Sequence, residues 1–516
     1  MSYHLLKYFA FFLPIAIIAY QVTPKKFRWI TLLIANYTFF CLICNVLVVY
    51  LLFSTLTAYY TGLWLKKVAD TAEGTSKEIT AKKRKVLAVG ILSNLLILIV
   101  LKYFNFFGQS IADLLNVFSL DVKFSAIKFL VPIGISYYTL QVISYLMDIY
   151  RGTIQAERNL AKVALYLSFF PQIMEGPISR FNQVADDLYS GEGIKFDNLK
   201  FGYQRIVWGL FKKIVVADRV AAVVGTVFDN YADYDGSIIV VGVLCFTCQL
   251  YMEFSGCMDI VIGSGQIFGI RLPENFRQPF LAKDASDFWH RWHITLGTWF
   301  KDYIFYTVSL AKPVKNFAKK VKEKFGKNVS KFVAPTIALL CVWSCNGLWH
   351  GAKWTYIFYG MFYFVIIFIE NIFEEPVRKL ADKLHINRES MGYRIFRIVK
   401  LFIIINIGEM FFRADTVKDG FIMLGRIFSD FHISQFLCKW NVLGMDRFDV
   451  WVAIVGIAIV FAVGILKEKN IQIRESIAKW VLPARWILWY AIIVLVVVFG
   501  AYGAGYDNIA MIYAGY

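Results

Sequence analysis

Long apolar segments without charge dominate this sequence. From Trp29 to Leu65 the chain contains no charged residue, and a helix needs only about 20 mostly apolar residues to cross the hydrocarbon core of a bilayer. Of the 516 residues, 58% are hydrophobic and 18% are charged, whereas about a quarter of a typical soluble chain is charged. This pattern excludes a disordered chain and a cytosolic globular enzyme. We expect an all-α, polytopic transmembrane helical protein.

The apolar segments predict roughly 11–13 membrane crossings, some of them short or re-entrant, around a central funnel. The stretch from Trp29 to Leu65 is too long for one helix, so we divide it near Asn45. Because the apolar character continues along nearly the whole length, we expect a single multi-pass domain over residues 1–516. The candidate spans lie near residues 6–22, 29–65, 86–101, 125–147, 160–175, 203–229, 236–254, 333–349, 354–373, 396–412, 449–466 and 484–502.

The charge is strongly unbalanced, with 55 lysines and arginines against 37 acidic residues, a formal net charge of +18. Two short loops, residues 66–85 and 312–331, are especially basic. Short basic loops beside membrane helices normally stay in the cytoplasm, so we predict that each of these loops is cytoplasmic. In a membrane protein such an excess is typical of contact with the lipid bilayer and its anionic headgroups, and we expect no nucleic-acid partner.

One segment, from Met252 to Lys301, combines weak hydropathy with many charges. Charged side chains at membrane depth face a cavity or a partner, and Pro273 and Pro279 interrupt any continuous helix. The segment therefore predicts the wall of an active site. Its ionisable residues are Glu253, Asp259, Arg271, Glu274, Arg277, Asp284, Asp287, His290, Arg291 and His293.

His350 follows an apolar run and directly precedes Gly351, a natural helix terminator. This order places His350 at the C-terminal end of a transmembrane helix. Asn346 lies four residues earlier and so on the same helical face, where its amide could orient or polarise what His350 contacts. Histidine suits general-base catalysis because its unperturbed pKa is near neutrality, and burial keeps the ring neutral.

Two further histidines, His290 and His293, lie three residues apart in a segment rich in tryptophan. At this spacing their imidazoles would be neighbours on one helical face. They could serve catalysis, or they could belong to an aromatic belt at the membrane interface. Together with His350 they could also supply three nitrogen ligands to zinc. No carboxylate is evident that would orient such ligands, so we expect no metal.

At these residues the sequence resembles the membrane-bound O-acyltransferase superfamily, and within it the branch of the alginate O-acetyltransferase membrane subunit. The similarity extends from about residue 130 to residue 415. It is carried by GISYYTLQVISYLMDIYRG (134–152), FFPQIMEGPISRF (169–181), FSGCMDIVIGSGQIFGIRLPENFRQPFLA (254–282), FWHRWHITLGTWFKDYIF (288–305), NGLWHGAKWTYIFYG (346–360) and EMFFRAD (409–415).

The resemblance implies that His350, the histidine of GLWHG, is catalytic and that His293, the histidine of RWH, is the second characteristic one. This chain has His290 where the family usually has arginine or asparagine. No role carries over to His290, which we expect to be structural.

Four further residues are expected to contact the substrates. Asn346 or the Trp349 indole would orient the acyl group, and Arg291 with His293 would stabilise charge or position the donor. Asn275, within the matching string 254–282, is expected among the substrate-binding residues.

The implied reaction moves an acetyl group from a cytoplasmic thioester, acetyl-CoA, toward hydroxyls of an extracytoplasmic polysaccharide. Acetyl-CoA would be a substrate, and no permanently bound cofactor is expected. An SGNH-hydrolase-like acetyltransferase or a carrier protein would be the partner, because this chain has no GDS-type nucleophile segment of its own. The implied location is the inner (cytoplasmic) membrane of a bacterium.

Two alternatives stay open. The acyl group could be D-alanyl or another group, and the acceptor could be teichoic acid, peptidoglycan or a lipid. From a different class, the chain could be a transporter or flippase for lipid-linked sugars. A transporter would predict paired, discontinuous helices in matching halves, and this sequence has one charged, broken region with no symmetric counterpart.

Overall fold

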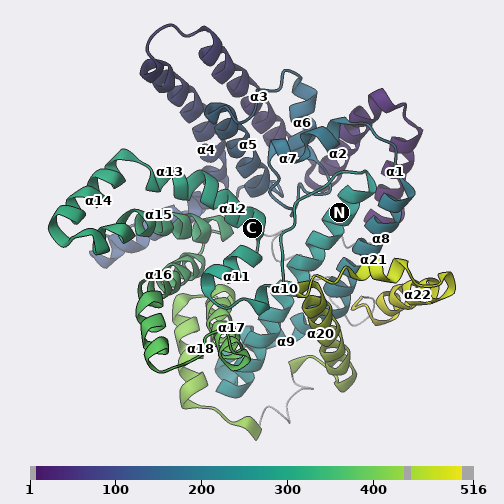
Figure 1. The fold of residues 1–516 in the computed structure, drawn as a ribbon, viewed down its shortest axis with the longest axis vertical. Helices are drawn as coiled ribbons and strands as arrows, with labels where there is room; N and C mark the ends of the chain where they lie inside the picture. Colours follow the sequence, from purple (N-terminus) through teal and green to yellow (C-terminus); the bar gives the residue numbers. More distant parts are fainter. Residues whose placement is uncertain (1–6, 435–442, 503–516) are drawn as a thin grey trace. The chain divides into compact units, whose positions relative to one another are not determined.

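The computed structural model describes residues 7–434 and 443–502, which fold into helices joined by loops (Figure 1). Within these residues the only β-type pairing is a single bridge between Phe276 and Trp292. In the described part of the chain, seven helical segments are long and apolar enough to cross a membrane, by length and composition. The expectation of an all-α, polytopic membrane protein is confirmed.

The described chain forms two compact units, of which the first contains residues up to Ile206 together with Cys257–Pro273. The helices α8 (Phe196–Leu210) and α10 (Gly236–Ile267) contribute to both units, and the single domain expected from the sequence stays a prediction. The other helices of the first unit are η1 (Tyr8–Phe12), α1 (Leu13–Val22), η2 (Lys25–Phe27), α2 (Arg28–Cys44), η3 (Asn45–Leu47), α3 (Val48–Thr71), α4 (Ser76–Val117), α5 (Ile135–Arg151), α6 (Leu160–Ser168) and α7 (Phe181–Tyr189).

The second unit contains Val207–Gly256 and the described residues from Glu274 onward. Its helices besides α8 and α10 are η4 (Phe211–Ala217), α9 (Asp218–Asp229), η5 (Tyr231–Asp233), η6 (Pro279–Leu281), α11 (Ala285–Arg291), α12 (Ile294–Phe300), η7 (Lys301–Phe305), α13 (Tyr306–Ser309), α14 (Lys312–Phe325), α15 (Lys327–His350), α16 (Trp354–Lys383), α17 (Met391–Arg413), α18 (Val417–Ser429), α20 (Arg447–Glu468), α21 (Ile473–Ala478) and α22 (Leu482–Phe499).

The longest uncharged stretch divides where the sequence predicts. Helix α2 ends at Cys44 and α3 begins at Val48, with one turn of 3-10 helix between them. Asn45 has φ of 48°, a left-handed conformation that asparagine tolerates better than most residues. The division near Asn45 is confirmed.

Several other expected spans have a different form, which explains why fewer long helices are found than the crossings expected. The span near 160–175 contains only the nine-residue α6, because Pro171 and Pro177 favour a buried irregular loop after Ser168. The span near 203–229 is interrupted by η4, a π-helical turn. Mid-helix π turns occur often at functional sites.

Helix α10 continues beyond its expected end at residue 254 to Ile267. In this continuation, glycines let α10 approach α8 closely. In the first unit, a Cβ atom on Gly263 would lie 2.7 Å from the carbonyl oxygen of Gly202, and in the second unit a Cβ on Gly256 would lie 2.8 Å from that of Gly209. Helix–helix packing through small residues is typical of membrane proteins.

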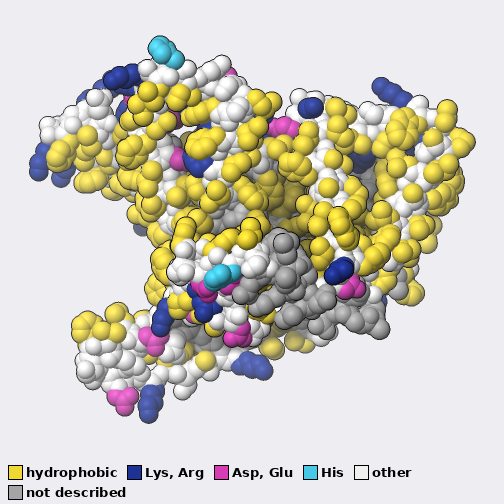
Figure 2. All heavy atoms as spheres, turned by 90° about the horizontal axis from the view of Figure 1, so that it is seen from below, with side chains coloured by type: hydrophobic (Ala, Val, Ile, Leu, Met, Phe, Trp, Pro, Cys, Tyr) yellow, Lys and Arg dark blue, Asp and Glu magenta, His cyan; other side chains and the backbone are white. Residues whose placement is uncertain are grey.

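Large hydrophobic side chains are exposed on the helical segments that could cross a membrane, as expected of a protein that lies in a bilayer. Val46 is 77% exposed, Leu92 63% and Trp451 66%. Figure 2 shows hydrophobic side chains spread over much of the face in view. Extended exposed apolar surface marks contact with lipid or another protein.

Candidate active site

His350 is the last residue of α15, and the helix ends there at Gly351, as the sequence predicts. The His350 side chain is only 3% exposed. Asn346, one turn earlier on the same helix, is also buried, and its Oδ1 atom has no hydrogen-bond partner among the residues that the structure describes. The predicted pairing of these two residues on one helical face is confirmed.

His293 lies in the junction between α11 and α12, where it caps the start of α12. Its backbone is left-handed, with φ of 47° and ψ of 51°, a conformation that costs a non-glycine residue roughly 1–2 kcal/mol. The side chain is 2% exposed. A strained backbone around a buried polar ring indicates a position fixed for function, since strain of this kind concentrates at functional sites.

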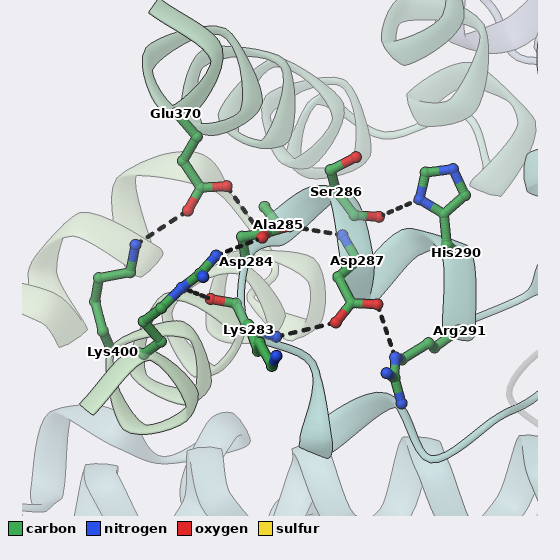
Figure 3. Close-up of polar contacts among 10 residues, drawn as sticks. Lys283, Asp284, Ala285, Ser286, Asp287, His290, Arg291, Glu370 and Lys400 are labelled. Carbon is green, nitrogen blue, oxygen red and sulfur yellow. Dashed lines mark hydrogen bonds and ion pairs between the residues drawn. The ribbon is translucent and has the colours of Figure 1, made fainter. Parts of the chain in front are cut away.

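His290 and His293 do not share a helical face, so that expectation is wrong. Helix α11 ends at Arg291, and the chain turns before His293. His290 stays on the helix and is exposed, with its Nδ1 2.7 Å from the Ser286 carbonyl oxygen (Figure 3). The 3-residue spacing would align the rings only if one helix contained both.

The indole of Trp349 contacts both buried histidines. Its ring centroid lies 5.5 Å from that of His293 and 5.0 Å from that of His350, with edge-on geometry in each pair. Burial, and after it the neighbouring His350, hold the pKa of His293 well below its ordinary value. The structure therefore brings together His293, Trp349 and His350, from two separate segments, around a neutral His293 ring.

The segment before α11 fixes the orientation of His293. The Ile294 N–H donates to the carbonyl oxygen of Asn275 at 3.0 Å, next to the bridge between Phe276 and Trp292. The Asn275 Oδ1 accepts from the Thr295 N–H at 3.0 Å and the Thr295 hydroxyl at 2.7 Å. It also lies 3.4 Å from His293 Nδ1.

These contacts let us assign the His293 tautomer from its hydrogen bonds. The side-chain atom facing Nδ1 is the Asn275 oxygen, which can only accept. Nδ1 therefore holds the proton, and Nε2 presents a lone pair. That Nε2 is buried and has no hydrogen-bond partner within residues 7–434 and 443–502. This buried nitrogen can accept a hydrogen bond from a donor group of a ligand.

Further aromatic rings pack against the two imidazoles. Phe254 packs edge-on against His293 at 4.8 Å. Around His350, the ring centroids of Phe412, Tyr359 and Tyr356 lie at 5.2, 6.0 and 6.4 Å. Such a low-dielectric enclosure strengthens electrostatic interactions within the site.

Arg291, expected to contact the donor, is held by two carboxylates. Its guanidinium pairs with Asp287 at 2.8 Å, drawn in Figure 3, and with Glu468 at 3.0 Å. Around it, further polar contacts tie the start of α11 to α16 and α17: Ala285 to Glu370, Glu370 to Lys400, and Asp284 to Arg397. The ion pairs of Arg291 therefore help to hold α11 in place. A contact between Arg291 and the substrate stays a prediction.

Two more charges of the predicted active-site wall form ion pairs instead. Glu253 is buried and pairs with the buried Lys213 at 3.2 Å. Asp259, in the first unit, pairs with Arg205 at 2.8 Å. The polar segment therefore supplies mainly structural ion pairs, and His293 and Asn275 are its residues beside the candidate site.

The same geometry bears on zinc. Among the described residues, no group of three or more His, Cys, Asp or Glu side chains is arranged to hold a metal ion. His290 is exposed, whereas His293 and His350 are buried.

Comparison with known families identifies this arrangement. The sequence model described as the membrane-bound O-acyltransferase family matches residues 154–411, which include both buried histidines. The chain belongs to the membrane-bound O-acyltransferase family. It is a multi-pass membrane acyltransferase.

Curated relatives of this membrane-bound O-acyltransferase act on different acceptors, according to their names. The chain is 32% identical to a probable alginate O-acetylase AlgI of Pseudomonas syringae pv. tomato, over 82% of this chain and 75% of the relative. It is 29% identical to a peptidoglycan O-acetyltransferase of Helicobacter pylori, over 67% and 64%. It is 27% identical to a teichoic acid D-alanyltransferase of Bacillus subtilis, over 48% and 60%.

The candidate site also contains residues that the sequence alone did not indicate. Tyr359 of α16 and Phe412 of α17 pack on His350, and Glu409 accepts a hydrogen bond from the Tyr359 hydroxyl at 3.2 Å. The string EMFFRAD contains Glu409 and Phe412, and a carboxyl group in an apolar stretch of a membrane protein is a signal of function. The partner of Glu409 is set by helix packing and is not visible in the sequence.

Proposed function

We propose that this acyltransferase transfers an acetyl group from a cytoplasmic thioester donor, acetyl-CoA, toward hydroxyls of an extracytoplasmic polysaccharide. The observation that carries the proposal is the meeting of His293 and His350 at Trp349, inside the segment matched by the family. The names of the relatives with the highest identities favour acetyl over D-alanyl as the acyl group.

In the proposed step, the neutral His350 ring removes the proton from an acceptor hydroxyl as its oxygen attacks the thioester carbonyl. A C–O ester bond forms, the C–S bond breaks, and the proton leaves with the thiol. A thioester is already activated, so the protein must mainly supply a base and donors for the developing oxyanion. A base that carries no charge before the reaction suits the buried, aromatic surroundings of His350.

His293 has a different role in this proposal. With its proton on Nδ1, the ring offers Nε2 as a hydrogen-bond acceptor. It can orient a donor group of the substrate, such as an amide N–H or the attacking hydroxyl. Asn346, one turn from His350, would donate its amide N–H to the acyl oxygen, with the Trp349 indole beside it.

Partner and location follow the same line of inference. An SGNH-hydrolase-like protein or a carrier would pass the acetyl group on outside the cytoplasm, and the bacterial inner membrane would hold the complex. Acetylation of peptidoglycan and D-alanylation of teichoic acid are the alternatives named by relatives. Mild alkaline release of acetate or D-alanine from each purified envelope polymer distinguishes the three outcomes.

Replacing His350 tests the central proposal. We expect His350→Ala to lower acetylation of the polysaccharide at least ~100-fold at unchanged membrane abundance, because a general base contributes about 10²–10⁴-fold. Base-labile acetate per milligram of polysaccharide measures the activity. The matched control is His290→Ala, a histidine that is exposed outside the site and should leave acetylation unchanged. Retained acetylation in His350→Ala would remove this residue from the mechanism.

A further inference from the structure

A buried carboxyl group, which forms no ion pair within residues 7–434 and 443–502, lies one aromatic ring away from the candidate base. Glu409 of α17 is 1% exposed. Its Oε1 accepts the Tyr359 hydroxyl at 3.2 Å, and its Oε2 has no hydrogen-bond partner in the described part of the chain. The proposed acetyl transfer assigns no role to this group.

Two other buried carboxylates in the second unit have a lysine as their partner. Asp218 and Glu253 both pair with the buried Lys213, at 2.7 and 3.2 Å. Burying a carboxylate without such a partner is very unfavourable, and the group becomes neutral instead. Glu409 is therefore suited to act as an uncharged hydrogen-bonding group.

The partner of Glu409 leads directly to His350. The Tyr359 ring packs edge-on against the His350 imidazole, with centroids 6.0 Å apart and planes at 87°. It also packs against Phe412 at 4.9 Å, and Phe412 itself lies 5.2 Å from His350. The hydrogen bond of its hydroxyl group thus holds one end of the Tyr359 ring. The ring itself packs against the His350 imidazole and Phe412.

The helices that carry these residues are held in close contact (Figure 1). A Cβ on Gly360 of α16 would lie 2.4 Å from the Trp343 carbonyl oxygen of α15, and a Cβ on Gly347 of α15 would lie 2.6 Å from the Tyr356 carbonyl oxygen of α16. A Cβ on Gly408, next to Glu409, would lie 3.1 Å from the Tyr363 ring. The close approach of these backbones sets where the side chains around His350 begin.

We infer that Glu409 is a positioning residue, which holds the Tyr359 ring through a neutral hydrogen bond and thereby sets the orientation of the His350 imidazole. The inference rests on the proposed function, in which His350 is the reacting base. The group needed at position 409 is a hydrogen-bond acceptor of this length, and neither its charge nor its proton takes part.

Three variants test this inference through acetyl transfer from labelled acetyl-CoA in membrane vesicles. Glu409→Leu removes the acceptor and Tyr359→Phe removes the donor, and each should lower kcat by about 10- to 100-fold, the range that a misplacement of about 1 Å produces. Glu409→Gln retains an acceptor oxygen of the same reach and should restore kcat to within about threefold of the parent. The matched control is Glu375→Leu on α16, at an exposed glutamate, which should leave kcat unchanged.

The outcomes separate this inference from the proposed function. A folded Glu409→Gln as inactive as Glu409→Leu would overturn the neutral role, and full activity in Glu409→Leu or Tyr359→Phe would overturn the positioning role. If Glu409→Leu does not fold, the comparison of Tyr359→Phe with Glu409→Gln still decides. An active His350→Ala would instead contradict the proposed function itself.

Discussion

At the scale of single residues, the candidate site depends on two imidazoles whose backbones have different conformations. His350 ends a regular helix, where a local pattern of apolar residues followed by glycine places it. His293 sits in a left-handed turn whose geometry comes from the Asn275 segment, 18 residues earlier. The first position was therefore predictable from neighbouring residues, whereas the second depended on pairing between separate segments.

The neutral state of His293 predicts how stability changes with pH. The unfolded chain binds a proton at this residue below its ordinary pKa of about 6.5, whereas burial holds the folded pKa well below that value. The contribution of the neutral His293 ring to the free energy of unfolding is therefore fully present above about pH 6.5. As the pH falls from there toward the folded pKa, this contribution decreases by about 1.4 kcal/mol per pH unit for one proton. Thermal unfolding of the purified protein between pH 8 and pH 5 measures the loss.

The variant His293→Asn should unfold with a weaker pH dependence, since asparagine binds no proton and tolerates the left-handed backbone. His290→Asn, at an exposed histidine, should keep the parental slope. Equal slopes in the parent and in His293→Asn would contradict the assignment of His293 as a buried neutral ring.

At the scale of elements, helix ends and breaks were more predictable than helix lengths. The division at Asn45 and the end of α15 follow from local signals. The continuation of α10 through Glu253 and Asp259 was missed, because their ion-pair partners Lys213 and Arg205 lie more than 30 residues away. The charged residues of this apolar segment therefore correctly indicated buried positions. Glu253 and Asp259 form ion pairs there, and they do not line the candidate site.

The contact between α15 and α16 gives a prediction at this scale. A larger side chain at Gly360 must displace backbone, since even a Cβ would lie 2.4 Å from the Trp343 carbonyl oxygen. We expect Gly360→Leu to destabilise the protein by about 1–3 kcal/mol and to reduce activity, measured by thermal unfolding and acetyl transfer.

The control for this contact is Gly425→Ala in α18, where an added Cβ meets no atom within 4 Å. It should be neutral or stabilising by up to about 1 kcal/mol, because alanine favours helix more than glycine. A Gly360→Leu protein as stable as the parent would show that α15 and α16 are not in close contact there.

At the scale of the whole molecule, composition predicted the class of protein and the family strings predicted the chemistry. The all-α membrane fold and the acyltransferase family are confirmed. Orientation in the membrane stays a prediction, which rests on the basic loops 66–85 and 312–331. The second of these loops forms the exposed helix α14.

Each basic loop should react from the cytoplasmic side. Lys77→Cys and Asn316→Cys replace exposed residues in the two loops and should be labelled by a membrane-impermeant maleimide in inside-out vesicles but not in intact spheroplasts. The parent, which has eight cysteines of its own, provides the background. Labelling of either variant from the outside would reverse the orientation of that loop.

The left-handed backbone of His293 has a consequence for the balance between stability and activity in this enzyme. Glycine or asparagine would adopt the backbone conformation of that turn at a lower cost in free energy. In the proposed mechanism, the residue whose Nε2 accepts a hydrogen bond from the substrate is thus one whose backbone conformation lowers the stability of the fold.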